Sequence, residues 1–221
     1  MSPTGISYDP VKDILSVADS ALDTVFVFTP DGTLLGERVP QGGYGRPGGV
    51  AFDADSNLYV ADVTRHQVVK FAADGNFLGV IKGQTAPEYD FNTPVHLAVD
   101  TEQQLYVTDS MNFRVEKFDE VGKSLSVFGK IGDVPGSFAR PRGVAIDSER
   151  HLYIADALLD NVQIFNQEGQ LLLAFGKTGT ERGEFSLPAG LFIDRHNRLY
   201  VVDSYNRRIQ IFTYLTDKAA P

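Results

Sequence analysis

Histidine, aspartate and arginine are the residues of this chain that could do chemistry. The 221 residues contain four histidines and no cysteine, which removes disulfides, thiolate metal sites and cysteine nucleophiles. His66, His96, His151 and His196 fall in different local contexts, whereas a metal site needs ligands that converge on one point. There is also no Gly-x-Ser-x-Gly elbow and no phosphate-binding loop. The sequence therefore points to no catalytic residue, no metal ligand and no cofactor.

Aspartate, in contrast, recurs at fixed positions. One aspartate ends each of five short apolar runs: Asp19, Asp62, Asp109, Asp156 and Asp203. A ring of charged carboxylates is one interpretation. The interpretation we favour is structural, because an aspartate at a strand end accepts hydrogen bonds from loop amides and can pair with arginines such as Arg114 and Arg208.

The elements that carry these residues repeat along the chain. Successive prolines of a Pro-x-Gly-Val-Ala-Ile-Asp-like segment stand at 47, 94, 141 and 188, and a weaker copy begins at Pro3. We expect one domain, residues 1–221, with repeats at about 3–46, 47–93, 94–140, 141–187 and 188–221. A fixed period of this length is typical of repeat architectures.

Each repeat contains up to four apolar runs of four to six residues, rich in Val, Ile, Tyr and Phe and bounded by turn residues. These runs predict strands, named a, b, c and d in chain order. Four antiparallel strands per period predict an all-β chain of the β-propeller class with five four-stranded blades, the last incomplete because strand d is not clear after Phe212. We expect the strand-c phenylalanines to wedge between blades (Phe71, Phe118, Phe165 and Phe212). The polar residues Glu116, Gln163 and Gln210 suggest that one side of strand c lies nearer water.

The segments resemble the NHL repeat. The copy that matches most fully is Asp203-Ser-Tyr-Asn-Arg-Arg-Ile-Gln-Ile-Phe212, and the connector Phe175-Gly176 to Pro188 also fits. The family's Asn and Arg survive together at Asn112 with Arg114 and at Asn206 with Arg208, and His96 replaces the glycine of strand a. The resemblance implies a ring that usually has six blades. Whether a sixth blade or a fused domain lies upstream, or five blades form an open arc, stays open.

Because antiparallel strands alternate in direction, the b–c loops and d–a connections share one face of the blades. Short loops that carry large residues on a rigid scaffold are typical binding positions. We predict a binding surface formed by Arg65, His66, Met111, Phe113, Leu158, Leu159, Tyr205 and Arg207. The alternative is local packing of these side chains over the blade edges. His96 and Arg142, near the start of strand a, are predicted at the mouth of a central channel, where a solvated pair is the simpler interpretation.

The functional prediction is a non-catalytic binding or scaffold module whose partner is another protein. A metal-dependent propeller hydrolase or lyase with a channel site is the first alternative, and RNA binding by this face is the second. The formal net charge of −9 disfavours nucleic acid, and no apolar run is long enough to insert into a membrane. The oligomeric state stays open. No signal peptide is visible, and the resemblance to exported bacterial proteins gives a lean to an extracytoplasmic location.

Overall fold

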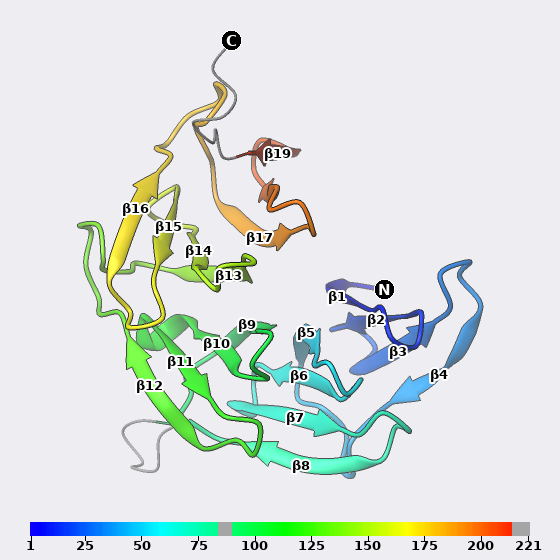
Figure 1. Ribbon diagram of the computed structural model, residues 1–221. Coiled ribbons are helices and arrows are strands. Elements are labelled where there is room, and N and C mark those ends of the chain that lie inside the picture. The colour runs from blue at the N-terminus through cyan, green and yellow to red at the C-terminus, as the bar shows by residue number, and fades with distance from the viewer. Residues whose placement is uncertain (84–89, 214–221) are drawn as a thin grey trace. The chain divides into compact units, whose positions relative to one another are not determined.

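The computed structural model describes residues 1–83 and 90–213 (Figure 1). It divides into two compact units, residues 1–131 and residues 132–221, and each is described by itself. The helical structure in the described ranges is the 3-10 turn η2 (Ser110–Asn112), so the all-β prediction is confirmed. Within the same ranges, no helix has the length and apolar character needed to span a bilayer.

Unit 1 contains three sheets of four antiparallel strands, which we name blades 1 to 3. Blade 1 comprises β1 (Pro3–Asp9), β2 (Ile14–Asp19), β3 (Thr24–Phe28) and β4 (Leu34–Arg38). Blade 2 comprises β5 (Pro47–Phe52), β6 (Leu58–Asp62), β7 (Gln67–Phe71) and β8 (Phe77–Ile81). Blade 3 comprises β9 (Pro94–Val99), β10 (Leu105–Asp109), β11 (Arg114–Phe118) and β12 (Ser124–Phe128).

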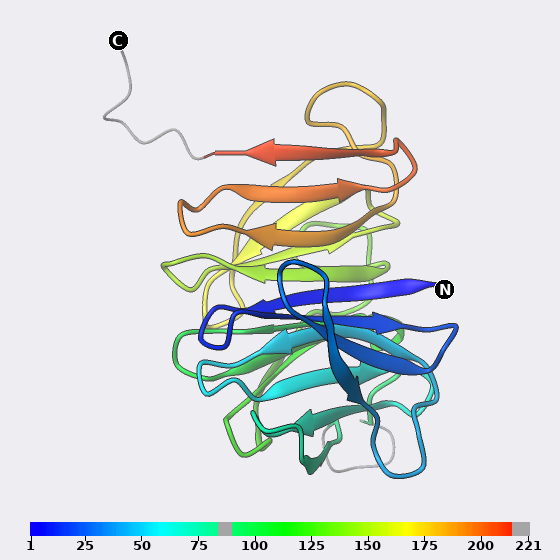
Figure 2. The ribbon, with the colours of Figure 1, turned by 90° about the vertical axis from the view of Figure 1, so that its right-hand side faces the viewer.

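Unit 2 contains blades 4 and 5. Blade 4 comprises β13 (Pro141–Ile146), β14 (Leu152–Asp156), β15 (Asn161–Phe165) and β16 (Leu171–Phe175). Blade 5 comprises β17 (Pro188–Ile193), β18 (Leu199–Asp203) and β19 (Arg208–Phe212). Figure 2 shows β17–β19 as a meander whose two turns lie at opposite ends of the sheet. The five blades of the propeller prediction are confirmed, with three strands described in the last. The prediction of a single domain over residues 1–221 stays a prediction.

Side chains of directly paired strand residues share one face of a sheet. The buried apolar residues lie on faces of neighbouring blades that pack against each other, so the core of each unit lies between its blades. In unit 1, a face of blade 2 that carries Tyr59 packs on a face of blade 3 that carries Leu105. The first consists of Ala51, Tyr59, Ala61 and Val68, and the second of Leu97, Leu105, Val107 and Phe118. We call these the tyrosine face and the leucine face. In unit 2, the tyrosine face of blade 4 (Ala145, Tyr153, Ala155, Val162 and Ile164) packs on the leucine face of blade 5 (Leu191, Leu199 and Val201).

The glycine in strand a has a steric cause. A Cβ built on Gly5 would lie 2.4 Å from the carbonyl oxygen of Gly48, and one on Gly49 would lie 2.8 Å from the Cα of His96. Both distances are shorter than any ordinary contact, and the atoms met are backbone. The innermost strands of neighbouring blades therefore approach one another as only glycine allows.

Each d–a connection buries an aromatic ring against the leucine face of the blade that follows it. The rings stand 47 residues apart: Tyr44, Phe91, Phe138 and Phe185. Phe91 lies 5.7 Å from Phe118, and Phe138 lies 5.7 Å from Phe165, between ring centroids. Phe71 and Phe118 are buried in the contact with the preceding blade, as predicted for strand-c phenylalanines, and Phe212 packs against the same kind of cluster.

One expectation about strand c is wrong. Glu116 and Gln163 were expected on a side nearer water, yet both are fully buried. The Gln163 amide donates to the carbonyl of Ser137 at 2.9 Å and accepts from the amide of Gly136 at 2.7 Å. The connector before blade 4 thus covers strand c and supplies its polar partners. Gln210 does the same in blade 5 with Gly183 and Glu184.

We predict that Phe165→Ala lowers the free energy of unfolding by about 3–5 kcal/mol, because it empties a fully buried position beside Phe138. Leu172→Ala, at an exposed position on β16 of the same blade, is the control and should change stability little. Denaturant unfolding measures both. Equal stability of the two variants would contradict the burial of Phe165 beside Phe138.

Candidate functional site

The candidate site is the rim formed by the b–c loops and the d–a connections, and the recurring aspartates hold this rim in place. Each aspartate at the end of strand b is buried and accepts backbone amides from the connection that precedes its blade. The donors are Ser2 to Asp19, Gly45 and Arg46 to Asp62, Asn92 to Asp109, Ala139 and Arg140 to Asp156, and Ser186 to Asp203. All five carboxylates therefore accept hydrogen bonds from the backbone of the chain itself, which confirms the structural interpretation.

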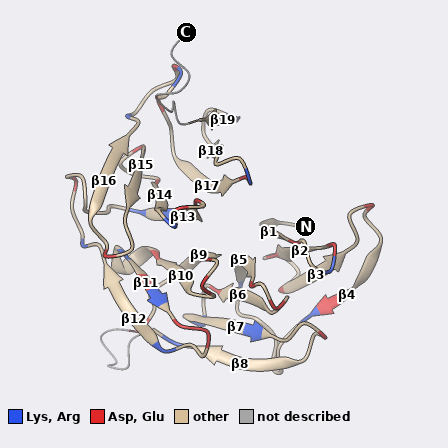
Figure 3. Cartoon of the chain, viewed as in Figure 1, with Lys and Arg blue, Asp and Glu red and all other residues tan. Residues whose placement is uncertain are grey.

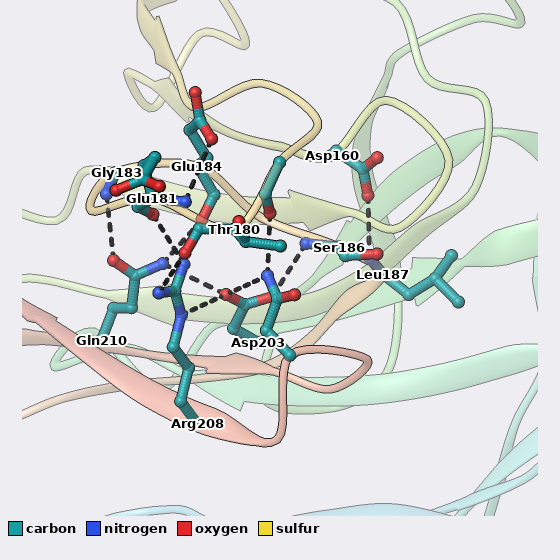
Figure 4. A network of polar contacts seen from close by, with 12 residues as sticks. Asp160, Thr180, Glu181, Gly183, Glu184, Ser186, Leu187, Asp203, Arg208 and Gln210 are labelled. Atoms are coloured by element: carbon teal, nitrogen blue, oxygen red, sulfur yellow. Dashed lines mark hydrogen bonds and ion pairs between the residues drawn. The ribbon is translucent and has the colours of Figure 1, made fainter.

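The Asn and Arg of the NHL-like segment complete this arrangement in blade 5 (Figure 4). Arg208 donates to the Asp203 carboxylate at 2.8 Å and to the carbonyls of Thr180, Glu181 and Glu184 at 2.7–2.9 Å. The Asn206 amide joins Asp203 to the carbonyl of Gly179. In blade 3, Asn112 and Arg114 bind Asp109 in the same way. The pair therefore fastens the connector to the end of strand b.

The same position of the repeat carries opposite pKa shifts in two blades. Burial works to raise the pKa of Asp203, but donors from Ser186, Asn206, Arg208 and Gln210 outweigh it and hold the pKa below the ordinary value. At Asp109, burial dominates and raises the pKa of the carboxyl despite the adjacent Arg114.

In unit 1, the side chains of two predicted binding residues form hydrogen bonds to the backbone of a connector. Arg65 donates from its guanidinium to the carbonyls of Gly42 and Gly43, so it fastens the connector from the position that Asn112 occupies in blade 3. His66 accepts the amide of Thr93 on Nδ1 at 3.2 Å. Met111 is exposed and Phe113 is half-buried. Local packing thus accounts for part of the contribution that unit 1 makes to the predicted surface.

In unit 2, the predicted residues are more open and are tied into one surface. Leu158, Tyr205 and Arg207 are exposed, while Leu159 is half-buried and donates its amide to Asp156. The amide of Tyr205 donates to Ser186, and the amide of Leu187 donates to the Asp160 carboxylate at 2.8 Å. Figure 4 shows Leu187 beside Asp160 at this rim.

The sequence analysis did not predict the exposed Leu187 as a binding residue. The residue type at its position in the connector differs between repeats, and this variation could have indicated it. The equivalent positions, 47 residues apart, hold Arg46, Thr93, Arg140 and Leu187. The residues of the b–c loops differ from repeat to repeat in the same way.

Several residues of this rim also share an uncommon backbone conformation. The residue before strand c is left-handed in every repeat, with φ between 49° and 55° at Asp23, His66, Phe113, Asp160 and Arg207. Aspartate tolerates this region, whereas histidine, phenylalanine and arginine are not favoured there. Leu187 is also left-handed, with φ of 52°. The a–b turns at the opposite face hold the same conformation at Asp13, Ser56, Gln103, Arg150 and Asn197. Left-handed residues therefore occur at both faces, and those of the rim include the bulky side chains of Phe113, Leu187 and Arg207.

A pocket lies beside the rim of blade 5. It has a volume of about 310 Å³ and is lined by Val202, Asp203, Ser204, Arg207, Arg208 and Ile209. The walls combine two guanidinium-bearing residues with two apolar side chains. The pocket can therefore accept a small group that carries both an apolar part and an acceptor.

The predicted channel-mouth residues lie in separate units. His96, in unit 1, stands at the glycine position of strand a, and its buried Nδ1 has no hydrogen-bond partner. Burial lowers the pKa of His96 to about 4, so the imidazole is neutral at pH 7. Arg142, in unit 2, is half-buried. A channel mouth shared by these two residues stays a prediction.

At the opposite face, titratable side chains stabilise the a–b turns through hydrogen bonds. The aspartate after strand a caps the a–b turn and accepts the tyrosine hydroxyl of strand b, as Asp147 does with Tyr153 at 3.0 Å. His151 lies 3.0 Å from the same carboxylate. Within the two described ranges, no three His, Asp or Glu side chains gather as a metal site would require. Figure 3 shows most charged residues in turns and loops rather than in strands.

We predict that Asp203→Asn lowers the free energy of unfolding at pH 7 by about 1–3 kcal/mol, because an amide group would face four donors. The folded pKa of Asp203 is depressed, so its stabilisation is present above about pH 4 and is lost as the pH falls through the folded value. The deficit of the variant should therefore shrink in acid.

Thermal unfolding from pH 7 to pH 3 measures this change. Asp133→Asn, an exposed position in the same unit, is the control. A deficit that is equal at all pH values would show that the Asp203 charge does not hold the connector.

Comparison with known proteins agrees with this architecture. The model of the NHL repeat matches residues 44–71 and 185–212. No curated protein matches the sequence. Many solved structures share the fold, among them virginiamycin B lyase from Staphylococcus aureus, with a TM-score of 0.70 and 14% identity over 99% of this chain and 72% of the lyase chain.

Two further structures show the same fold with other named activities. A gluconolactonase from Xanthomonas campestris has a TM-score of 0.73 and 19% identity over 95% of this chain and 75% of its own. Hydrazine synthase from Kuenenia stuttgartiensis has a TM-score of 0.65 and 12% identity over 97% of this chain and 84% of its own. At these identities the likeness concerns the fold alone. The two repeat matches and the observed blades support the assignment to an NHL-repeat β-propeller family.

Proposed function

We propose that this chain is a binding module that recognises another protein through the rim of its b–c loops and d–a connections. The observation that carries the proposal is the group of Leu187, Tyr205 and Arg207 in unit 2. All three are exposed, and hydrogen bonds tie the backbone segments that present them to one another. Two of them hold a left-handed backbone that their side chains do not favour.

The chemistry of the group indicates the kind of partner. Tyrosine and arginine are enriched among residues that dominate protein interfaces. Leu187 and Tyr205 offer apolar surface, and Arg207 beside the pocket of blade 5 offers a donor for a carboxylate or a carbonyl. The expected partner is a protein segment that presents an apolar side chain next to an acidic group.

A photo-crosslinking amino acid at position 205 tests this proposal in cells that naturally make the protein. We expect a discrete adduct with another protein, and we expect Leu187→Glu to reduce its yield by about tenfold, as the loss of one interface anchor does. The same label at Glu149, an exposed a–b turn residue, is the control. Equal crosslinking at the two positions, or adducts unaffected by Leu187→Glu, would contradict the proposal.

The second candidate is a metal-dependent hydrolase or lyase, and it is favoured by the likeness in fold to a lyase and a gluconolactonase. Elemental analysis of the purified chain separates the two functions. The binding proposal expects no stoichiometric zinc or calcium. One equivalent of either metal, retained through gel filtration, would favour the enzyme.

The RNA alternative has less support from the described rim. Of its basic residues, Arg65 is engaged with the carbonyls of Gly42 and Gly43. An affinity for RNA that falls steeply with added salt would support this alternative.

A further inference from the structure

Two b–c loops of the rim each accept a backbone amide from the connector that follows their blade. In unit 1, the amide of Thr93 donates to Nδ1 of His66 at 3.2 Å. In unit 2, the amide of Leu187 donates to the carboxylate of Asp160 at 2.8 Å. The donor follows the acceptor by 27 residues in both cases, and we call these two hydrogen bonds the connector bonds of unit 1 and of unit 2. They are equivalent in place and differ in the chemistry of the acceptor.

The aspartates that end strand b explain why these two amides donate to the preceding blade. In blades 2 and 4, the connector amide at this position, of Arg46 and of Arg140, donates to that aspartate. In blades 3 and 5, the aspartate accepts the amide one residue earlier, and the amides of Thr93 and Leu187 donate to the preceding b–c loop instead. The connector bonds therefore fix this part of the connector in blades 3 and 5.

The connector bond of unit 1 joins two residues whose backbone conformation is unfavourable. The φ angle is 53° at His66 and 64° at Thr93. A left-handed conformation is uncommon for residues other than glycine, and for a β-branched residue such as threonine it persists only where surrounding contacts maintain it. The carbonyl of Thr93 also accepts the amide of Ser110 at 3.2 Å. Loss of the connector bond thus removes one of the contacts that hold Thr93 in this conformation.

The acceptor in unit 1 functions only while its imidazole is neutral. A backbone N–H can only donate, so Nδ1 of His66 must carry the lone pair and Nε2 the proton. A second proton on Nδ1 would face the N–H of Thr93, donor against donor. Histidine is the side chain whose charge ordinarily changes between about pH 5 and 8, whereas carboxyl groups ordinarily titrate near about pH 4. The two connector bonds therefore differ in the pH range that affects their acceptors.

One other titratable group near this bond needs to be separated from His66. Asp109 accepts the amide of Asn92, the residue before Thr93, and burial raises the pKa of its carboxyl. Its protonation would also act on this connector. The charged residues on the elements around the connector bond of unit 1 are Asp62 and Arg65 in blade 2, and Asp90, Asp109, Arg114 and Glu116 at blade 3.

We propose that His66 makes the rim of unit 1 responsive to acid. The connector bond is closed while the imidazole is neutral, and it opens when Nδ1 takes up a proton, which releases Thr93 from the b–c loop of blade 2. The connector bond of unit 2 stays closed in the same range. Opening needs no partner, but its consequence, that weak acid loosens the part of the binding rim in unit 1 and not the part in unit 2, rests on the proposed function.

Amide hydrogen exchange, followed by NMR on the full chain at about pH 7.5 and about pH 5.5, tests this proposal. Protection factors relate each amide to an unfolded chain at the same pH, so they remove the direct effect of pH on exchange. We expect the protection of the Thr93 amide to fall by about fivefold at the lower pH, and that of the Leu187 amide to change by less than about twofold. The nitrogen chemical shifts of His66 should place the proton on Nε2 at the higher pH.

Two variants isolate the imidazole. His66→Asn keeps an acceptor that does not titrate, has the reach of Asp160 in unit 2 and tolerates a left-handed backbone, so Thr93 should stay protected at both pH values. His66→Phe removes the acceptor, and Phe113 at the equivalent position of blade 3 shows that the fold accepts this ring. In that variant the protection of Thr93 at the higher pH should fall to the level of the unmodified chain at the lower pH.

Equal protection of Thr93 at both pH values in the unmodified chain would overturn the proposal, as would a proton on Nδ1 at the higher pH. A pH response that persists in His66→Asn would assign the titration to another group, such as Asp109, and would overturn it as well. None of these results bears on the binding proposal, which crosslinking at position 205 tests at one pH. Failure of that crosslinking would likewise leave the exchange result standing.

Discussion

The structure depends on how closely the innermost strands of neighbouring blades approach. Glycine at the third position of strand a lets one backbone lie directly on the next, as Gly5 does on Gly48 and Gly143 does on Ala189. That approach brings a tyrosine face and a leucine face into contact along the rest of the two sheets. No blade buries both of its faces alone, so the apolar contact between blades is what stabilises each of them.

The rim follows from the same constraint. Fixed blades leave the ends of strand b at regular positions, where one buried aspartate can bind both a b–c loop and the connection before it, as Asp156 does with Leu158 and Arg140. Where the repeat departs from its usual residues, another side chain takes over, and Arg65 is the example. With the backbone held in this way, exposed side chains such as Tyr205 can vary without loss of the fold.

The sequence predicted the strands and their order because a constant spacing between like segments survives many substitutions. It also predicted the structural use of the aspartates, since loop amides at a strand end need acceptors. It could not show that Glu116 and Gln163 are buried, because the residues that cover strand c come from a connector with no pattern of its own. For the same reason the rim could be located, but the link between Leu187 and Asp160 required the folded chain.

The most direct measurement compares Gly143→Ala with Gly190→Ala by denaturant unfolding. The two glycines occupy the same repeat position, but a Cβ meets neighbouring backbone only at Gly143. We expect Gly143→Ala to lose about 1–3 kcal/mol and Gly190→Ala to change stability by less than about 0.5 kcal/mol. Equal losses at the two positions would contradict the claim that contact between blades, and not the sheet itself, requires the glycine.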